Sequence, residues 1–272
     1  MDLLIESTAP KRSVAQLRQI STVIIAANEA DRIANAIQSC QLFADEIIVI
    51  DSDSQDDTIQ IAQALGCQVY SNPWAGYAKQ RNFGSRQATF DWIFFLDADE
   101  TLDQQLSAAL LDWKQRPHLE ANAFSCQRIG DFLDGWLYGR PECHVRLYNR
   151  IAFQIKDVLV HERVDVNHAP IGKLPGTILH RGFRNLSEMV IRFNRYTDLD
   201  AEETYNQLQC FSYWRLLLKP PAKFLQMYLW NYLWQQGISG FTVSVLWSYY
   251  IFLKEIKLYE LSCNHSAANR PK

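Results

Sequence analysis

The sequence lacks several features that would by themselves assign a protein to a class. Its 6 cysteines form no C-x-x-C pair, so we expect reduced cytosolic thiols and neither a zinc site nor a disulfide framework. The first twenty residues lack the basic start and apolar run of a signal peptide, which predicts a protein that stays on the side of the membrane where it is made. A formal net charge of −3 gives no reason to expect nucleic-acid binding.

The sequence also has no internal repeat and no low-complexity linker, so its 272 residues can form one large domain or one domain with an appendage. Hydrophobic residues make up 48% of the chain and charged residues 21%, a balance that can bury a substantial core. In the first half, β-branched apolar runs alternate with segments that have apolar residues at helical spacing. This alternation predicts a mostly parallel sheet flanked by helices. The expected strands are 22–27, 46–50, 67–70 and 91–96, and the expected helices are 31–41, 56–65, 77–88 and 103–113.

The pattern changes in the second half of the chain. Glycine and proline interrupt short extended segments, which predicts a small mixed or antiparallel region that covers the edge of the sheet. After Asn185 the sequence becomes helical and then rich in aromatic residues. The extended segments are expected at 123–126, 145–149 and 158–166, and a helix at 186–205. The expected division is an N-terminal extension (1–20), an α/β domain (21–184) and a C-terminal helical region (185–272).

Acidic and amide side chains follow three of the expected strands at the points where the strands end. These segments are Asn28-Glu29, Asp51-Ser52-Asp53-Ser54 and Asp97-Ala98-Asp99-Glu100. Because ligands of parallel sheets gather beyond the carboxyl ends of the strands, we expect the three segments to line one pocket. Unpaired carboxylates repel one another, and a hard divalent cation that also binds substrate phosphates would relieve that repulsion. The pattern therefore predicts a metal-assisted site for a nucleotide-diphosphate substrate.

Helix capping is the alternative interpretation of the same residues. Thr101 and Asp103 are placed to cap the helix that follows the third acidic segment, and Ser54 to cap the second helix. Asp51 has no such capping role. A carboxylate fixed at a strand end can accept a hydrogen bond from a base or a ribose hydroxyl, which makes Asp51 the better candidate for a ligand-binding residue.

Two cations, Lys79 and Arg81, lie in the segment A-K-Q-R-N-F-G near the start of the third expected helix. Cationic side chains and backbone N–H groups at a helix N-terminus together suit a diphosphate. The alternative is an ordinary solvated helix face.

The ordered set of these motifs resembles a known family. N-E after the first strand, D-S-x-S-x-D-x-T after the second, K-Q-R-N near residue 80 and D-A-D-E after the fourth look like a family 2 glycosyltransferase of the GT-A (nucleotide-diphospho-sugar transferase) fold. Within it they resemble the branch that includes lipopolysaccharide-core glycosyltransferases. The resemblance implies a nucleobase bound by Asp51, with Asn28, Glu29 and Asp53 shaping the same pocket. It also implies a ribose near Asp97 and a diphosphate near Lys79 and Arg81.

The resemblance further implies a bound Mg²⁺ or Mn²⁺ that bridges the diphosphate, with Asp99 as its ligand. The family often has a histidine at the position of His180, which is the second expected metal ligand, although an isolated histidine is more often a structural hydrogen-bonding residue. Members of the family invert the anomeric carbon, and inversion requires a general base that deprotonates the acceptor hydroxyl.

The segment Asp157-Val-Leu-Val-His-Glu-Arg-Val164 is the best place for that base. Related enzymes have a V-H-E segment here, and we expect Glu162 to be the base, with His161 as the weaker alternative. Because successive side chains of a strand point to opposite faces, only one of these two can face the acceptor. The structural alternative is that Glu162 pairs with an arginine on the surface of the sheet, and Asp157 or Asp165 would then be the next candidates for the base.

The C-terminal region combines tryptophan, tyrosine and phenylalanine with flanking lysines. Its two apolar segments, 224–234 and 241–253, are both shorter than the ~20 apolar residues that a transmembrane helix needs. The composition suits a membrane interface, and the alternative is a pair of helices packed on the α/β domain or on a second subunit. Related enzymes often have a D-G-x-x-G-F segment where this chain has Q-G-I-S-G-F, so Gln236 removes the acid to which an acceptor role would be assigned.

The sequence therefore predicts a metal-dependent inverting glycosyltransferase that uses a nucleotide-diphosphate sugar, most simply a UDP-sugar. The expected acceptor is a glycan or a lipid-linked glycan in cell-envelope or lipopolysaccharide synthesis. The expected location is peripheral, on the inner face of the cytoplasmic membrane. One alternative is a sugar nucleotidyltransferase, but the glycine-rich basic loop that such enzymes carry after their first strand is missing from Ala26-Ala27-Asn28-Glu29. The other alternative is a non-catalytic nucleotide-sugar-binding protein of the same fold.

Overall fold

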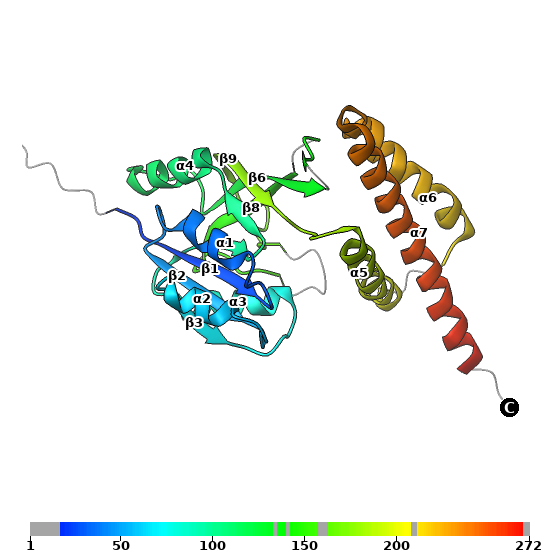
Figure 1. Cartoon of the computed structure of the whole chain (residues 1–272), viewed down its shortest axis with the longest axis horizontal. Coiled ribbons are helices and arrows are strands. Elements are labelled where there is room, and N and C mark those ends of the chain that lie inside the picture. The colour runs from blue at the N-terminus through cyan, green and yellow to red at the C-terminus, as the bar shows by residue number, and fades with distance from the viewer. Residues whose placement is uncertain (1–16, 133–134, 140–141, 157–162, 208–210, 269–272) are drawn as a thin grey trace, which may run out of the picture.

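The computed structural model describes residues 17–132, 135–139, 142–156, 163–207 and 211–268, which form an α/β unit followed by a group of helices (Figure 1). The strands belong to one nine-stranded sheet, in which eight follow the order β3-β2-β1-β4-β8-β6-β9-β5 and β7 pairs with β6. The α/β prediction is confirmed.

The first half of the sheet is parallel, as the alternation of strands and helices predicted. β1 pairs in parallel with both β2 and β4, and β2 pairs in parallel with β3. These strands carry apolar side chains on both faces because helices cover both sides of the sheet. The strands are β1 (Ile20–Ala26), β2 (Glu46–Asp51), β3 (Gln68–Ser71) and β4 (Trp92–Asp97), and the crossover helices are α1 (Ile33–Cys40), α2 (Thr58–Ala64) and α3 (Tyr77–Gln87).

The second half of the chain extends this sheet, where we had expected a small region covering its edge. β8 pairs antiparallel with β4, and β6 then pairs antiparallel with β8 and in parallel with β9. The mixed and antiparallel pairing that we expected at this edge is confirmed, but the strands are longer than expected, because glycines and prolines that looked like interruptions lie within or beside them. Gly172 and Pro175, for example, both belong to β9. The elements are β5 (Glu100–Leu102), α4 (Gln104–Gln115), β6 (Ala123–Phe132), β7 (Gly135–Trp136), β8 (Glu142–Asn149) and β9 (Gly172–His180).

The core of the α/β unit has one layer on each side of the sheet. On one side, apolar residues of α1 and α4 pack on β1, β2 and β4 around the fully buried Trp113 and Phe94. On the other side, α3 packs on the same strands close to Gly84, where an added Cβ would lie 2.4 Å from Val23. A larger residue at position 84 would therefore push α3 away from the sheet.

The capping predictions have different outcomes. Asp103 is the N-cap of α4 and its carboxylate accepts a hydrogen bond from the Leu106 N–H at 2.7 Å, as expected. Ser54 does not cap α2, which begins at Thr58 after the N-cap residue Asp57. The Ser54 hydroxyl instead bonds to the Asp51 carboxylate.

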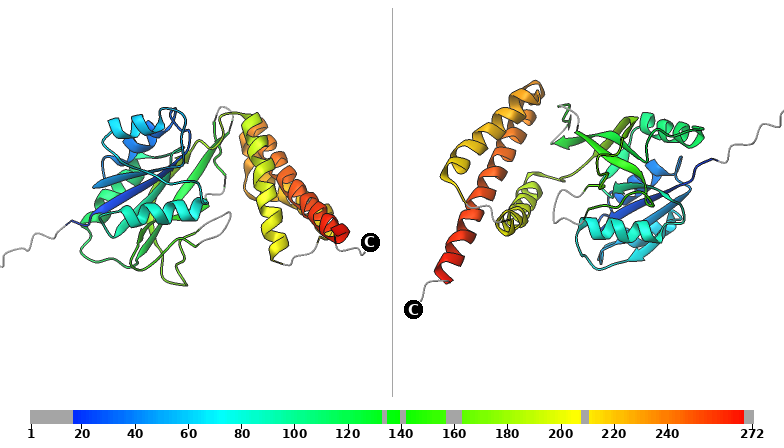
Figure 2. Two further views of the ribbon diagram at one scale, coloured as in Figure 1. Left: turned by 90° about the horizontal axis from the view of Figure 1, so that it is seen from below. Right: turned by 180° about the vertical axis from the view of Figure 1, so that it is seen from behind.

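The C-terminal helices follow the end of β9 and lie beside the α/β unit (Figure 2). α5 and α6 both pack against the long helix α7. No helix within the described part of the chain is both long and apolar enough to cross a membrane. The elements are α5 (Leu186–Asn206), α6 (Tyr213–Leu225), a π-helical turn η1 (Gln226–Trp230), a 3₁₀ turn η2 (Leu233–Gln236) and α7 (Gly237–Ala268).

Candidate active site

The acidic segments after β2 and β4 lie at the same edge of the sheet. Asp51 is in register with Ala26 of β1, and Asp97 is in register with the adjacent Ile25. Since β1 lies between β2 and β4, the Cα atoms of Asp51 and Asp97 are separated by two strand spacings, or about 10 Å. This distance is short enough for one nucleotide to contact both segments.

Asp51 organises the loop that follows β2. Its side chain is 0% exposed. The carboxylate accepts hydrogen bonds from the Ser54 N–H at 3.0 Å and the Ser54 hydroxyl at 2.5 Å, and that hydroxyl accepts from the Asn28 N–H at 2.9 Å. Asn28 and the exposed Asp53 both have positive φ angles, 56° and 58°, a region in which these residue types are enriched. Asp51 therefore ties the first two acidic segments together, and a base can reach its carboxylate only if the Ser54 loop adjusts.

The two expected diphosphate-binding cations of α3 differ in their surroundings. Lys79 is exposed, whereas Arg81 is 5% exposed and its Nη2 lies 2.5 Å from Asp97 Oδ1. The Arg81 guanidinium also lies 5.0 Å from the centre of the Phe95 ring. The solvated-face interpretation is wrong for Arg81, because its charge holds Asp97 in place at the end of β4.

Asp99 and His180, the two expected metal ligands, lie in contact. His180 Nε2 is 3.3 Å from Asp99 Oδ2, because the antiparallel pairing of β5 with β9 places His180 opposite Glu100. Burial raises the pKa of Asp99, but the charge and hydrogen bond of His180 outweigh this effect and the net shift is downward. Gly182 packs closely against the His180 ring, since a Cβ at position 182 would lie 2.4 Å from His180 Cε1.

The Asp99 carboxylate oxygen and the His180 ring nitrogen, both possible metal ligands, therefore face each other at the end of the sheet. Among the residues that the structure describes, no group of three histidine, cysteine or acidic side chains is placed to bind a metal. The carboxylate and imidazole of Asp99 and His180 are donors that suit Mn²⁺, and a substrate diphosphate commonly supplies further oxygens to such an ion.

Glu100, the last residue of the D-A-D-E motif, turns inward and is 0% exposed. Arg146 binds both of its oxygens, each at 2.7 Å, and Arg128 Nε donates to one of them at 2.8 Å. The Asp97 N–H also donates to Glu100 at 3.1 Å. Burial disfavours the charged form, but the two arginines outweigh it and hold the pKa of Glu100 well below its usual value. Glu100 thus anchors the motif, while Asp97 and Asp99 remain at the rim.

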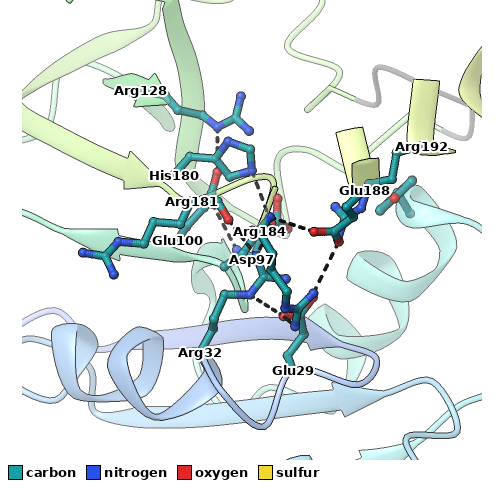
Figure 3. Close-up of polar contacts among 12 residues, drawn as sticks. Glu29, Arg32, Asp97, Glu100, Arg128, His180, Arg181, Arg184, Glu188 and Arg192 are labelled. Atoms are coloured by element: carbon teal, nitrogen blue, oxygen red, sulfur yellow. Dashed lines mark hydrogen bonds and ion pairs between the residues drawn. The ribbon is translucent and has the colours of Figure 1, made fainter. Parts of the chain in front are cut away.

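A second group of charges joins the Asn28-Glu29 segment to α5, and sequence reasoning missed it. Arg32 Nε contacts the Glu29 carboxylate at 2.7 Å (Figure 3). Its Nη1 lies 4.0 Å from the Asp99 carboxylate. Arg184 contacts Asp31 at 2.7 Å and Glu29 at 3.3 Å. Burial is the largest influence on Glu29 and leaves its pKa raised despite these arginines. The only sequence signal was the density of arginines between β9 and α5.

Asp131 has a buried carboxylate oxygen, Oδ1, without a hydrogen-bond partner among the described residues. It lies on β6 opposite Trp136, one residue after Gly130, which is in register with His180. Burial is the main reason that its pKa is raised. The Arg181 guanidinium lies 5.9 Å from the Trp136 ring centre. This aromatic and acidic group extends the rim beyond His180.

The expected base, Glu162, and its alternative, His161, lie outside the described residues, as does Asp157. Beyond them, Val164 forms an isolated bridge with Ile155, and the Asp165 N–H donates to the Gln154 carbonyl at 2.9 Å. The assignment of the base stays a prediction.

Comparison with known proteins places these features in a family context. The model of the family described as glycosyl transferase family 2 matches residues 21–169. An uncharacterized glycosyltransferase of Rickettsia typhi is 32% identical over 260 residues, which is 90% of this chain and 88% of that protein. The lipopolysaccharide core biosynthesis glycosyltransferase LpsC of Rhizobium meliloti is 28% identical over 270 residues, 93% of this chain and 95% of that protein.

Solved structures also match in part. Glucosyl-3-phosphoglycerate synthase from Mycobacterium tuberculosis, in complex with Mn²⁺, UDP and glucosyl-3-phosphoglycerate, aligns with a TM-score of 0.45 and 18% identity, covering 69% of this chain and 79% of that one.

Proposed function

Because the chain belongs to glycosyl transferase family 2 and is a glycosyltransferase, we propose that it transfers a sugar from a nucleotide-diphosphate donor, a UDP-sugar, with inversion and with the help of a divalent cation. The observation that carries this proposal is the placement of Asp51, Asp97 and Asp99 at the ends of neighbouring strands, together with the contact between Asp99 and His180.

In the proposed donor site the nucleoside binds between the ends of β2 and β4. Asp51 accepts a hydrogen bond from the base after a small movement of the Ser54 loop, and the exposed Asp53 and Asn28 line the same pocket. Asp97, held by Arg81, faces the ribose. Lys79, which is exposed on the helix that carries Arg81, is the proposed contact of the diphosphate.

Asp99 and His180 are the residues that would hold Mg²⁺ or Mn²⁺. Such a cation, when bound, neutralises the negative charge of the departing nucleoside diphosphate. Arg32, 4.0 Å from Asp99, adds a fixed positive charge beside this carboxylate. Glu100 and its two arginines keep the motif rigid, which preserves the positions of Asp97 and Asp99 between turnovers.

Glu162 is the proposed general base, and His161 is its alternative. The base takes the proton of the acceptor hydroxyl as that oxygen bonds to the anomeric carbon, and the bond from this carbon to the diphosphate oxygen breaks on the opposite side. We expect Glu162→Gln to lose turnover while it keeps its affinity for the donor. A near-normal turnover number would move the role of base to another residue, with Asp157 or Asp165 next in order.

The proposed acceptor is a glycan or a lipid-linked glycan of the cell envelope. The support is the similarity to LpsC over 95% of that protein's length, and its name places it in lipopolysaccharide core biosynthesis. The proposed location is peripheral, on the inner face of the cytoplasmic membrane, where nucleotide sugars and a lipid-linked acceptor meet.

A thermal-shift screen of nucleotide sugars with and without Mn²⁺ tests the donor site. Binding at a hundredfold excess over Kd stabilises a protein by about 2.7 kcal/mol, so a matching donor raises the melting temperature clearly. Asp99→Asn is expected to lose the Mn²⁺-dependent part of the shift and all transfer, whereas Asp112→Asn, an exposed acid on α4, serves as the matched control. Metal-dependent turnover that survives in Asp99→Asn would refute the assignment. Release of pyrophosphate in place of a nucleoside diphosphate would identify a nucleotidyltransferase.

A further inference from the structure

The C-terminal helices expose a large apolar surface. On α6 and η1, Trp214 is 73% exposed and Trp230 is 65% exposed, and long aliphatic side chains lie between them. We call this set the α6 surface. Its members are Tyr213, Trp214, Leu217, Leu218, Leu225, Leu229 and Trp230. Exposed apolar patches of this extent are uncommon on soluble monomers and mark interaction sites.

The α6 surface follows the helical period. Trp214, Leu218, Leu225 and Leu229 recur at intervals of four or seven residues, so they share one side of the helix. The opposite side faces α7, where the buried Pro220 accepts a hydrogen bond from the Ser248 hydroxyl at 2.8 Å. The inward side is therefore already used for folding, and the exposed side is left for a partner.

The charge around this surface is positive. Between Phe211 and Tyr259 the only acid is Glu255, whereas the cations are Arg215, Lys219, Lys223, Lys254 and Lys257. Glu255 is 1% exposed and is paired internally with Arg215 at 3.1 Å and Lys219 at 2.8 Å. In a chain with a formal net charge of −3, this segment is a cationic exception. Lys254 and Lys257 pair with Asp200 and Asp198 of α5. α6 itself carries Arg215, Lys219 and Lys223, and the acid that pairs with the first two is the buried Glu255, so the charge beside the α6 surface is positive and complements an anionic surface.

The helices are also fixed to the side of the molecule that carries the candidate active site. α5 begins at Leu186, a short connection after the rim residue His180, and Arg184 of that connection forms an ion pair with Glu188 of α5 (Figure 3). The β6–β7 hairpin packs on the same helices, since Phe132 and Leu233 belong to one buried cluster. A partner bound to the helices would therefore lie near the rim of the candidate active site.

From these observations we infer that the α6 surface docks onto an anionic lipid bilayer, with the helix in the plane of the interface, its tryptophans and leucines among the acyl chains and its cations at the headgroups. The inference deepens the proposed function, because it assigns the proposed membrane location to named residues. A second copy of this chain is the competing occupant, but two such surfaces would place like charges together.

Vesicle sedimentation with the full chain tests the inference. The probes are 100% phosphatidylcholine vesicles and vesicles with one quarter phosphatidylglycerol. Wild type is expected to bind the anionic vesicles more tightly. The double variant Trp214→Ser/Trp230→Ser is expected to lose binding on the order of tenfold or more. Lys219→Gln, which leaves Glu255 paired with Arg215, is expected to weaken binding about fivefold on anionic vesicles and not on neutral ones. Trp74→Ser is the matched control, since Trp74 is 45% exposed on the α/β unit.

Vesicle binding and oligomeric state can each overturn the inference. One overturning result is the absence of vesicle binding by wild type, or equal binding by the double variant. The other is a wild-type dimer in sedimentation velocity that the double variant abolishes, which would assign the surface to a second copy. Nucleotide-sugar thermal shifts on the same preparations separate the proposals: a donor shift without vesicle binding refutes the docking surface alone, and vesicle binding without any donor shift refutes the donor assignment alone.

Discussion

Replacing Glu100 with methionine tests whether the acidic motif is held by buried charge. Glu100 and Arg146 are 0% and 5% exposed and share two hydrogen bonds of 2.7 Å, and Arg128 adds a third bond. The variant leaves the Arg146 guanidinium buried beside the Phe95 carbonyl at 3.5 Å and the Phe95 ring, without the carboxylate that bound it through two hydrogen bonds. A buried charge that loses its partner is strongly destabilising.

Breaking a buried ion pair by removing one partner costs about 3–5 kcal/mol. In a chain of this size each kcal/mol lowers the melting temperature by about 2–4 °C, so Glu100→Met should lower it by about 10 °C. Arg128 is more exposed, and Arg128→Met leaves Glu100 paired with Arg146. That control should therefore cost about 1 kcal/mol.

Urea denaturation followed by circular dichroism measures these differences. The double variant Glu100→Met/Arg146→Met should recover most of the loss, because it removes both charges and leaves apolar side chains of similar volume. A loss below about 1 kcal/mol for Glu100→Met, or a double variant that is less stable than either single variant, would refute the reasoning.

Three further predictions follow from local geometry. Gly182→Ala should displace the His180 ring and weaken the Mn²⁺-dependent donor shift, with little loss of melting temperature. Gly135→Ala is the control, since no atom lies within 4 Å of its added Cβ, and it should change neither quantity. Equal Mn²⁺ dependence in the two variants would contradict the role of the close contact. Burial raises the pKa of Glu46, but hydrogen bonds from Ser21 and Thr89 outweigh it and lower the pKa below 4.5. Wild type should therefore be more stable than Glu46→Gln above about pH 4.5, and this advantage should disappear as the pH falls through the folded-state pKa, as urea titrations at pH 3 to 7 can show. Burial raises the pKa of Cys40 and of Cys126 to about 12, so a thiol reagent at pH 8 should label the exposed Cys143 and Cys263 first; early labelling of Cys40 would mean that its core opens.

The sequence predicted the parallel half of the sheet well because each strand there is a continuous apolar run bounded by a helix with its own periodicity. Between residues 121 and 178 it predicted mixed or antiparallel strands but underestimated their lengths, because strands such as β9 contain glycine and proline and pairing there depends on residues far away in the chain. Ser54 was predicted to cap a helix because its type and position fit that role, but its hydroxyl donates to the nearby Asp51 carboxylate instead. Local patterns rank the options for a side chain, and a distant partner can still change the outcome.

Strand patterns in the sequence were enough to show which acids reach the rim of the sheet, since parallel strands that end in Asp51 and Asp97 must bring them to the same edge. Only the tertiary structure decided what each acid does there. Glu100 turns inward and pairs with two arginines, Asp97 pairs with Arg81, and Asp99 contacts His180 at the end of β9. The physical reason is that a charge takes the partner that strand order and register bring within a few ångströms, and order and register arise from packing of the whole sheet.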